Sequence, residues 1–269
     1  MKKIAIFGLM LAVLGAEYAN AAPLFGIGQD NILGFQAVGN KTGALTPALG
    51  DKLFGVVNVQ DNTVKAGGTI WNAQNVTPLY DSFTGYFVAE VKSVTATATV
   101  QGTFYSVKMG VASSDPNGIM TSSDLSAGTI MKLYTDSTTP YTTGGSVATD
   151  IGNATDGVLW ASLGMTAAGG NWDVSLAPSP FPNGSDGGFN FITNNTGLNW
   201  AKVAGTGCTG EGCDVVFSST FNTLAGAWQY GINNPAKIHP LSVPLPAAAW
   251  LLGSGLIGLA GLGRRKTLV

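Results

Sequence analysis

Two cysteines are the residues whose type and spacing most directly suggest chemistry. Cys208 and Cys213 enclose four turn-forming residues, in the run Cys-Thr-Gly-Glu-Gly-Cys. A redox dithiol favours a two-residue spacing at the N-terminus of a helix, and this run has neither feature. In an exported chain, such a pair is expected to close a small structural disulfide loop.

The other residues that could perform chemistry do not form a recognisable catalytic or metal-binding set. His239 is the only histidine, so a histidine-dependent triad has no supported base and a zinc cluster of conventional spacing cannot be assembled. Glycoside hydrolysis needs two carboxylates across a cleft, and no spacing singles out such a pair. We therefore predict a protein with no catalytic residues, no metal and no cofactor.

Two short runs rich in side chains with oxygen ligands leave a calcium-binding site as an alternative to the prediction of no metal. Residues 115–118 read Asp-Pro-Asn-Gly and residues 183–187 read Asn-Gly-Ser-Asp-Gly. Neither run matches an EF-hand loop. Asx turns are the commoner reason for such residues, so both runs are interpreted as turns.

Composition excludes one class of partner. The 269 residues include 38 glycines, and only 10% are charged while 45% are hydrophobic. The body between the two ends carries eight lysines and no arginine against 14 acidic residues. Nucleic-acid binding requires basic phosphate contacts, so we expect no nucleic-acid partner.

The N-terminus has the pattern of a secretory signal peptide. Lys2 and Lys3 form a positive start, residues 4–16 are almost entirely apolar, and Ala19-Asn20-Ala21 offers a small-x-small cleavage site. A membrane anchor is the alternative, but the apolar run is shorter than the ~20 residues that a span needs. We assign residues 1–22 to the signal peptide.

The C-terminus combines an apolar stretch with a basic tail. Residues 245–263 contain no charge and are long enough to span a bilayer as a helix. Arg264, Arg265 and Lys266 follow at once, which places the C-terminus in the cytoplasm by the positive-inside rule. A buried core helix is the alternative, but it would need a polar face that this stretch lacks.

The residues that precede this stretch make the pattern specific. The motif is Val243, Pro244, Leu245, Pro246 and Ala247, followed by a glycine-spaced apolar helix and the basic tail. Residues 243–269 together resemble the PEP-CTERM sorting signal in its Val-Pro-Leu-Pro-Ala form, with leucine in place of the usual glutamate. The resemblance implies recognition and cleavage by a membrane-embedded exosortase of a Gram-negative bacterium. It also implies an inner-membrane intermediate with the body in the periplasm, then delivery to the cell surface or to a secreted exopolysaccharide matrix.

The physical chemistry of the tail favours processing over permanent anchoring. Pro244 and Pro246 disfavour a helix, so the segment before Ala247 is expected to be extended and accessible. Glycines at positions 255, 258 and 261 share one helical face and would let another helix approach closely, with the sorting enzyme as the expected partner. These packing residues are Gly255, Gly258 and Gly261. A generic glycine-rich span is the alternative.

The body, residues 23–242, is predicted to be one all-β domain. Residues 94–100 alternate apolar side chains with threonine, a period of two that a helix would not produce. Other short apolar or alternating runs are separated by glycine-rich turns and lie at residues 53–59, 85–91, 104–111, 129–134, 158–163, 172–176, 189–192, 214–221 and 228–233. No helical periodicity of useful length appears outside the termini. Such strands must bury one face each, which predicts a β-sandwich or a jelly roll.

Three function classes follow from these observations. The first is a non-catalytic cell-surface or exopolysaccharide-matrix protein. The second is a carbohydrate-binding module or adhesin, in which exposed indole rings stack on sugars. Its candidate residues are Trp71, Trp160, Trp172, Trp200 and Trp228. The third is a secreted hydrolase, which the missing catalytic residues disfavour.

Overall fold

The computed structural model describes the body of the chain. Residues 25–241 are described apart from residues 45, 65–66, 74–81, 137–140, 142, 167–168, 179–182, 206–207 and 209–211. The predicted signal peptide, residues 1–22, and the predicted sorting signal, residues 243–269, lie outside the described residues.

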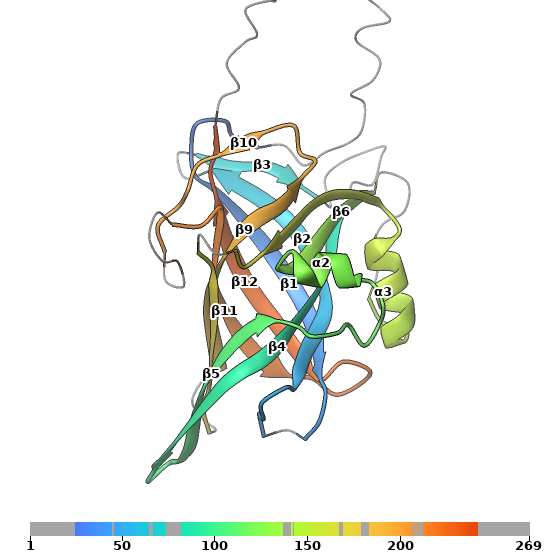
Figure 1. Cartoon of the computed structure of the whole chain (residues 1–269). Helices are drawn as coiled ribbons and strands as arrows, with labels where there is room; N and C mark the ends of the chain where they lie inside the picture. The colour runs from blue at the N-terminus through green and yellow to red at the C-terminus, as the bar shows by residue number, and fades with distance from the viewer. Residues whose placement is uncertain are drawn as a thin grey trace, which may run out of the picture.

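The described residues are mostly strands (Figure 1). The strands in chain order are β1 (Asn31–Lys41), β2 (Lys52–Val64), β3 (Gly68–Asn72), β4 (Ser82–Thr99), β5 (Gly102–Val111), β6 (Thr129–Asp136), β7 (Val158–Gly164), β8 (Asn171–Leu176), β9 (Asn183–Asn194), β10 (Asn199–Trp200), β11 (Val215–Thr223), β12 (Tyr230–Ile238) and β13 (Pro240–Leu241). The helices are α2 (Ser122–Ser126) and α3 (Val147–Thr155). The all-β prediction is confirmed.

The two helices depart from the prediction that the body has none. At five and nine residues, they are too short for hydrophobic periodicity to reveal them. Side-chain caps stabilise both: Thr121 Oγ1 accepts a hydrogen bond from the Asp124 amide at 3.1 Å, and Ser146 Oγ accepts one from the Thr149 amide at 3.2 Å. Thr121 and Asp124 also form a reciprocal capping box, which is the signal that could have located α2.

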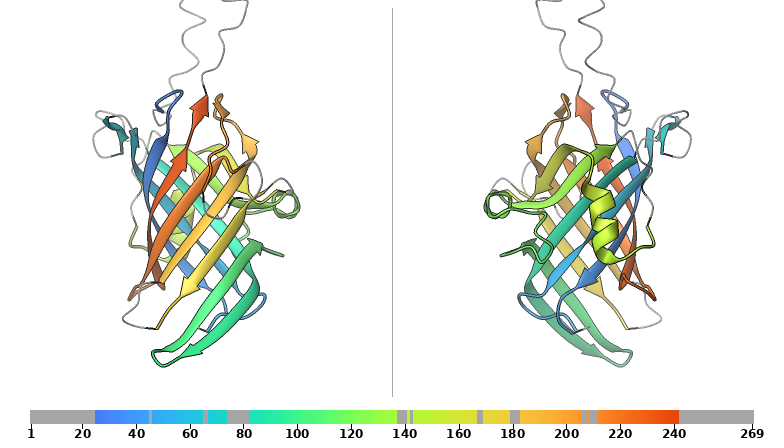
Figure 2. Two further views of the ribbon diagram at one scale, coloured as in Figure 1. Left: turned by 90° about the vertical axis from the view of Figure 1, so that its left-hand side faces the viewer. Right: turned by 90° about the vertical axis from the view of Figure 1, so that its right-hand side faces the viewer.

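One antiparallel sheet closes on itself to form a barrel (Figure 2). Around the barrel, β2 pairs with β1, β1 with β12, β12 with β11, and β11 with β9. The pairing of β2 with β4 completes the closure on the other side. This differs from the two separate sheets of the predicted sandwich, because closure pairs the sheet edges with each other instead of leaving them exposed.

Two different strand pairs fill the gap between β4 and β9. The first part of β4 pairs with β6, which pairs with β7. The later part of β4 pairs with β5, which pairs with β8. Strand β9 completes both connections, through β8 near its start and through β7 near its end. Eight strands therefore surround the interior at each end of the barrel.

Apolar residues are buried on both sides of the barrel wall. Inside, Phe83, Phe87 and their neighbours form the larger core cluster. Outside, Tyr86 and Val88 of the same strand pack beneath α3 in a second cluster. The first ten residues of β4 are buried on both faces, which explains why residues 85–89 form a continuous apolar run rather than an alternating one.

The glycine-rich run that was predicted to be a turn at residues 183–187 is instead the start of β9. Its pairing with β8 and β11 is regular antiparallel. A Cβ on Gly187 would overlap the Phe217 ring, and a Cβ on Gly188 would overlap the sulfurs of Cys208 and Cys213. Glycine is therefore used here for close approach of other groups to a strand, not for a turn.

Candidate functional site

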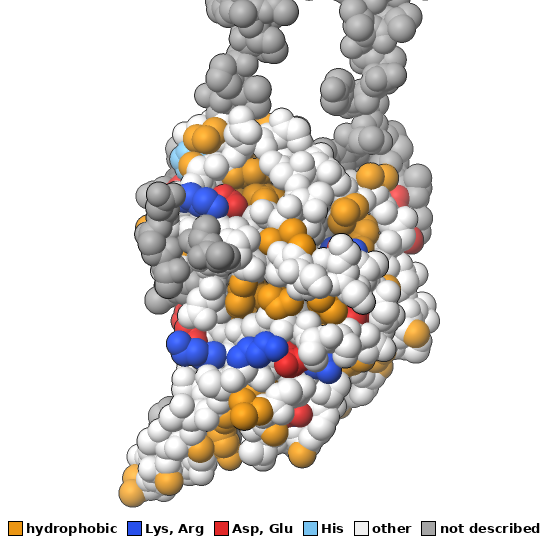
Figure 3. Space-filling view, viewed as in Figure 1, with side chains coloured by type: hydrophobic (Ala, Val, Ile, Leu, Met, Phe, Trp, Pro, Cys, Tyr) orange, Lys and Arg blue, Asp and Glu red, His pale blue; other side chains and the backbone are white. Residues whose placement is uncertain are grey.

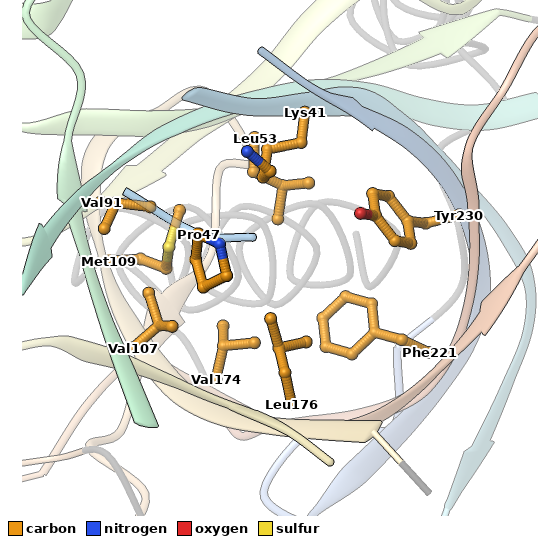
Figure 4. Close-up of a pocket in the computed structure, with 10 residues that line it drawn as sticks. All are labelled: Lys41, Pro47, Leu53, Val91, Val107, Met109, Val174, Leu176, Phe221 and Tyr230. Carbon is orange, nitrogen blue, oxygen red and sulfur yellow. The ribbon is translucent and has the colours of Figure 1, made fainter. Parts of the chain in front are cut away.

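A small cavity opens at one end of the barrel, and we refer to this cavity as the mouth (Figure 4). Its volume is about 50 Å³. Most of its lining side chains are aliphatic or aromatic, and they come from seven strands and from the segment between β1 and β2. The lining residues are Lys41, Pro47, Leu53, Val91, Val107, Met109, Val174, Leu176, Phe221 and Tyr230.

Strand register explains why these side chains face one another. Val107 of β5 lies opposite Val174 of β8, and Tyr105 lies opposite Leu176 two residues further along. Side chains two residues apart in a strand share a face, so each strand contributes successive layers to the interior. On β8 and β11, Val174 and Phe221 line the mouth, and residues 172 and 219 line the next cavity inward.

Aromatic rings form the floor of the mouth. Phe87 and Trp172 meet edge to face with ring centroids 5.9 Å apart. The Phe87 ring lies against the backbone at Gly55, where a Cβ would come within 2.9 Å of the ring and would also overlap the Val38 carbonyl. Below this floor are two further apolar cavities of about 30 Å³ each, which share Phe35, Phe189 and other lining residues.

Tyr230 provides a hydroxyl group in the largely apolar mouth. Figure 4 shows this hydroxyl pointing toward the centre of the cavity. Burial raises the pKa of Tyr230 above its ordinary value of 10. The group is therefore a neutral phenol near pH 7, able to donate or accept one hydrogen bond.

Lys41 also lines the mouth, but its ammonium group is already paired. Nζ lies 2.6 Å from Asp51 Oδ2 and 2.8 Å from the Thr42 carbonyl, and only 9% of the side chain is exposed. Desolvation would raise the pKa of Asp51, but hydrogen bonds from Lys41 and from the Ala48 amide outweigh it and lower that pKa below its usual value. The lysine stem lines the cavity while its charge is neutralised by Asp51.

Residues 46–51 fold across the mouth. Pro47 is buried in it, although its described neighbours are exposed. The segment is held to β4 by hydrogen bonds from the Gly50 amide to the Val91 carbonyl, 3.0 Å, and from the Val91 amide to the Asp51 carbonyl, 2.8 Å. Pro47 therefore occupies part of the opening that a ligand would use.

The opposite end of the barrel is closed by aromatic rings. Phe25 stacks on Trp160 at 5.6 Å, and Phe191 stacks on Trp200 at 5.1 Å. Phe25 and Trp200 also meet edge to face at 5.4 Å. The two ends of the barrel are thus covered differently, by aromatic rings at this end and by residues 46–51 at the mouth.

No family model, no curated protein and no solved structure matches this chain.

The structure joins the two predicted cysteines. Cys208 and Cys213 are disulfide-bonded, with their Cα atoms 5.6 Å apart. The bridge packs against Gly188 of β9, and Cys213 pairs with Val203 through backbone hydrogen bonds in both directions, of 2.7 and 3.1 Å. The pair therefore fastens the segment before β11 to the barrel wall, in agreement with a structural role.

The candidate tryptophans are not arranged for stacking on sugars. Trp71, Trp160, Trp172 and Trp228 are only 5–6% exposed. Trp200 is partly buried among the aromatic rings that close the end opposite the mouth. Trp228 also lies outside the strand predicted at residues 228–233, because β12 begins after it and its indole packs in the outer cluster.

Asp115 and His239, two polar residues that the sequence singled out, have structural partners. Asp115 Oδ1 accepts hydrogen bonds from the Tyr86 hydroxyl at 2.5 Å and from the Asn117 amide at 3.0 Å, as expected for an Asx turn. His239 Nδ1 lies 2.8 Å from Asp30. Within the described ranges, no group of three or more histidine, cysteine, aspartate or glutamate side chains could hold a metal ion.

The predicted sorting residues, Val243 to Ala247, the packing glycines 255, 258 and 261, and the basic residues 264–266 lie outside the described residues. In the part of the chain that the structure describes, no helix is long and apolar enough to cross a membrane.

Proposed function

We propose that this chain is an exported, non-catalytic cell-surface or exopolysaccharide-matrix protein that is sorted and cleaved by an exosortase-type membrane enzyme. The observation that carries the proposal is the ordered sequence of Pro-Leu-Pro motif, apolar stretch and basic tail in residues 243–269. The signal-peptide pattern of residues 1–22 supports export to the compartment where such an enzyme would act.

The positions of the two chain ends support a barrel whose mouth is displayed away from the membrane. The two ends of the described chain lie together, since the Gly28 amide donates to the Pro240 carbonyl at 2.8 Å (Figure 1). Strand β1 runs from this end, at Asn31, to the mouth, at Lys41. At ~3.3 Å per residue, the two ends of β1 are roughly 33 Å apart. A tail attached at a membrane would therefore leave the mouth facing away from it.

The cavities support a binding or structural role more than hydrolysis. Among the described residues that line the mouth and the two deeper cavities, the polar side chains are Lys41, Ser219 and Tyr230. None of these described lining residues is a carboxylate, whereas glycoside hydrolysis needs a pair that flanks the bond.

Mass spectrometry of the exported protein tests the proposal. In a host that contains an exosortase, the mature chain is expected to begin at Ala22 or Pro23 and to lack the basic tail. Replacing Pro244 and Pro246 together with alanine should extend the helix, hide the cleavage region and leave the full tail in the inner-membrane fraction. Deleting the exosortase should have the same effect.

Pro235→Ala provides a matched control, because Pro235 is an exposed residue of β12 within the barrel. This variant should be processed like the wild type. An intact tail on wild-type protein from the exosortase-containing host would contradict the proposal, since the apolar stretch would then be a permanent anchor.

A further inference from the structure

The mouth and the cavities below it form successive apolar layers inside the barrel. The mouth, at about 50 Å³, is smaller than the ~150 Å³ apolar cavity that holds a benzene ring. An aromatic ring or a fused-ring ligand would therefore have to displace the wall. The end of an unbranched chain would fit the available width.

The apolar surface of the mouth continues beyond the barrel along the hairpin of β4 and β5. Val94 pairs with Val107 of the mouth, and Ala96 pairs with Tyr105 in the next inward-facing layer. Cross-strand partners lie on the same face of a sheet, so this face of the hairpin extends the inner wall. Ala96 and Ala98 are exposed there. Apolar side chains are visible on the projecting hairpin at the lower left of Figure 3.

The polar groups favour an uncharged ligand. Tyr230 can exchange one hydrogen bond with a hydroxyl or carbonyl group. A carboxylate would find the Lys41 ammonium already paired with Asp51 and would lie close to that negative charge. It would also enter a body with 14 acidic residues and eight lysines.

We infer that the mouth is a binding site for an uncharged, single-chain aliphatic molecule, such as a fatty alcohol or a neutral acyl derivative. The polar end reaches Tyr230 in the mouth, and the aliphatic chain runs from there past Val107 and Val174 and onward along the hairpin. The site is independent of the sorting signal, so failure of the proposed sorting would not affect it.

Titration calorimetry on the exported, purified protein tests this inference with 1-hexanol, 1-heptanol, 1-octanol and octanoate as probes. Saturable binding of octanol is expected, with each added methylene tightening the dissociation constant about fourfold. Octanoate should bind at least tenfold more weakly than octanol. Absence of saturable octanol binding to folded protein would overturn the inference, and equal binding of octanoate would overturn its restriction to uncharged ligands.

Two adjacent positions on β8 give a matched pair of variants. Val174→Trp fills the mouth and should weaken octanol binding at least tenfold, whereas Ser175→Trp adds the same ring at an exposed position and should leave binding unchanged. Unchanged binding in folded Val174→Trp protein would overturn the proposed location.

Tyr230→Phe keeps the ring and removes the hydroxyl, which makes it a second test if Val174→Trp does not fold. It should weaken octanol binding several-fold while preserving the fourfold gain per methylene. If octanol binds this variant as tightly as it binds the wild type, Tyr230 does not contact the polar end of the ligand and the inferred orientation is wrong.

Discussion

Individual carboxylates with several donors hold the outer segments to the barrel, and Asp150 is the most buried of them. Its side chain accepts hydrogen bonds from Trp228 Nε1 at 2.7 Å and from the Gly144 and Gly145 amides at 3.3 and 3.2 Å. Asp150→Ala should lower the free energy of unfolding by about 3 kcal/mol, because three donors lose their partner in a buried site. Chemical denaturation measures this change.

Asp156 is the control for Asp150, since it lies at the C-terminal end of the same helix. Burial and the nearby Asp136 raise its pKa, so its charge is unfavourable there. Asp156→Ala should leave stability unchanged or increase it slightly. Equal losses in the two variants would show that the hydrogen bonds of Asp150 are not the source of its effect.

Glu90 should make stability depend on pH in the acid range. Burial opposes its ionisation, but hydrogen bonds from Lys92 and Ser113 outweigh burial and lower its pKa to about 2. Because this value lies below the ordinary 4.5, the stabilisation is complete above pH 4.5 and is lost as the pH falls toward 2. Glu90→Gln should cost about 2 kcal/mol at pH 7 and should flatten the stability profile over this range.

Lys92→Met separates the contribution of the Lys92 ion pair to the stabilising effect of Glu90 from that of the Ser113 hydrogen bonds. Lys92 is 45% exposed, and the two hydrogen bonds from Ser113 to Glu90 remain when it is replaced. The loss of stability at pH 7 should therefore be smaller than for Glu90→Gln. A wild-type protein whose unfolding free energy is the same at pH 2 and pH 5 would contradict the role assigned to Glu90.

Among the secondary-structure elements, β9 depends on the close approach of the disulfide to Gly188. Replacing both cysteines with alanine should lower stability by about 2 kcal/mol without preventing folding, because the closed loop is short. Gly188→Ala should cost about 2 kcal/mol in the disulfide-bonded protein and less in the double-alanine protein, since its Cβ would overlap the two sulfurs. Thermal and chemical unfolding of the four proteins give this double-mutant cycle.

Gly184→Ala in the same strand is the matched control. Its Cβ would approach the Ser219 carbonyl only to 3.2 Å, so its cost should be smaller than that of Gly188→Ala. Overlap with the disulfide would not explain the loss of stability if Gly188→Ala lowers the free energy of unfolding by the same amount with and without the cysteines. Labelling of both thiols in native exported protein would separately show that the bridge does not form.

At the scale of the whole molecule, closure of the barrel divides β4 into two parts of different stability. Residues 83–90 pair with β2 on one side and with β6 or β5 over most of the other, whereas residues 94–99 pair with β5 alone. Hydrogen exchange should therefore be slow along the first part and fast at alternate amides of the second, whose groups face solvent. Equally slow exchange along all of β4 would indicate that another element or another copy covers the open edge.

Local sequence patterns predicted most of the long strands, but not β1 or the start of β9, and the folded barrel decided how the strands are joined and what they enclose. The alternation at residues 94–100 and 172–176 correctly predicted the last part of β4 and almost all of β8, because a period of two is a property of the strand itself. Closure depends on pairings such as Leu53 with Ala89 and Asn31 with Ile238, which bring together residues far apart in the chain. The same long-range pairing places Val107 opposite Val174, brings Tyr230 into the mouth and places Gly188 beside the disulfide. These contacts are set by packing between distant segments, so they follow only from the tertiary structure.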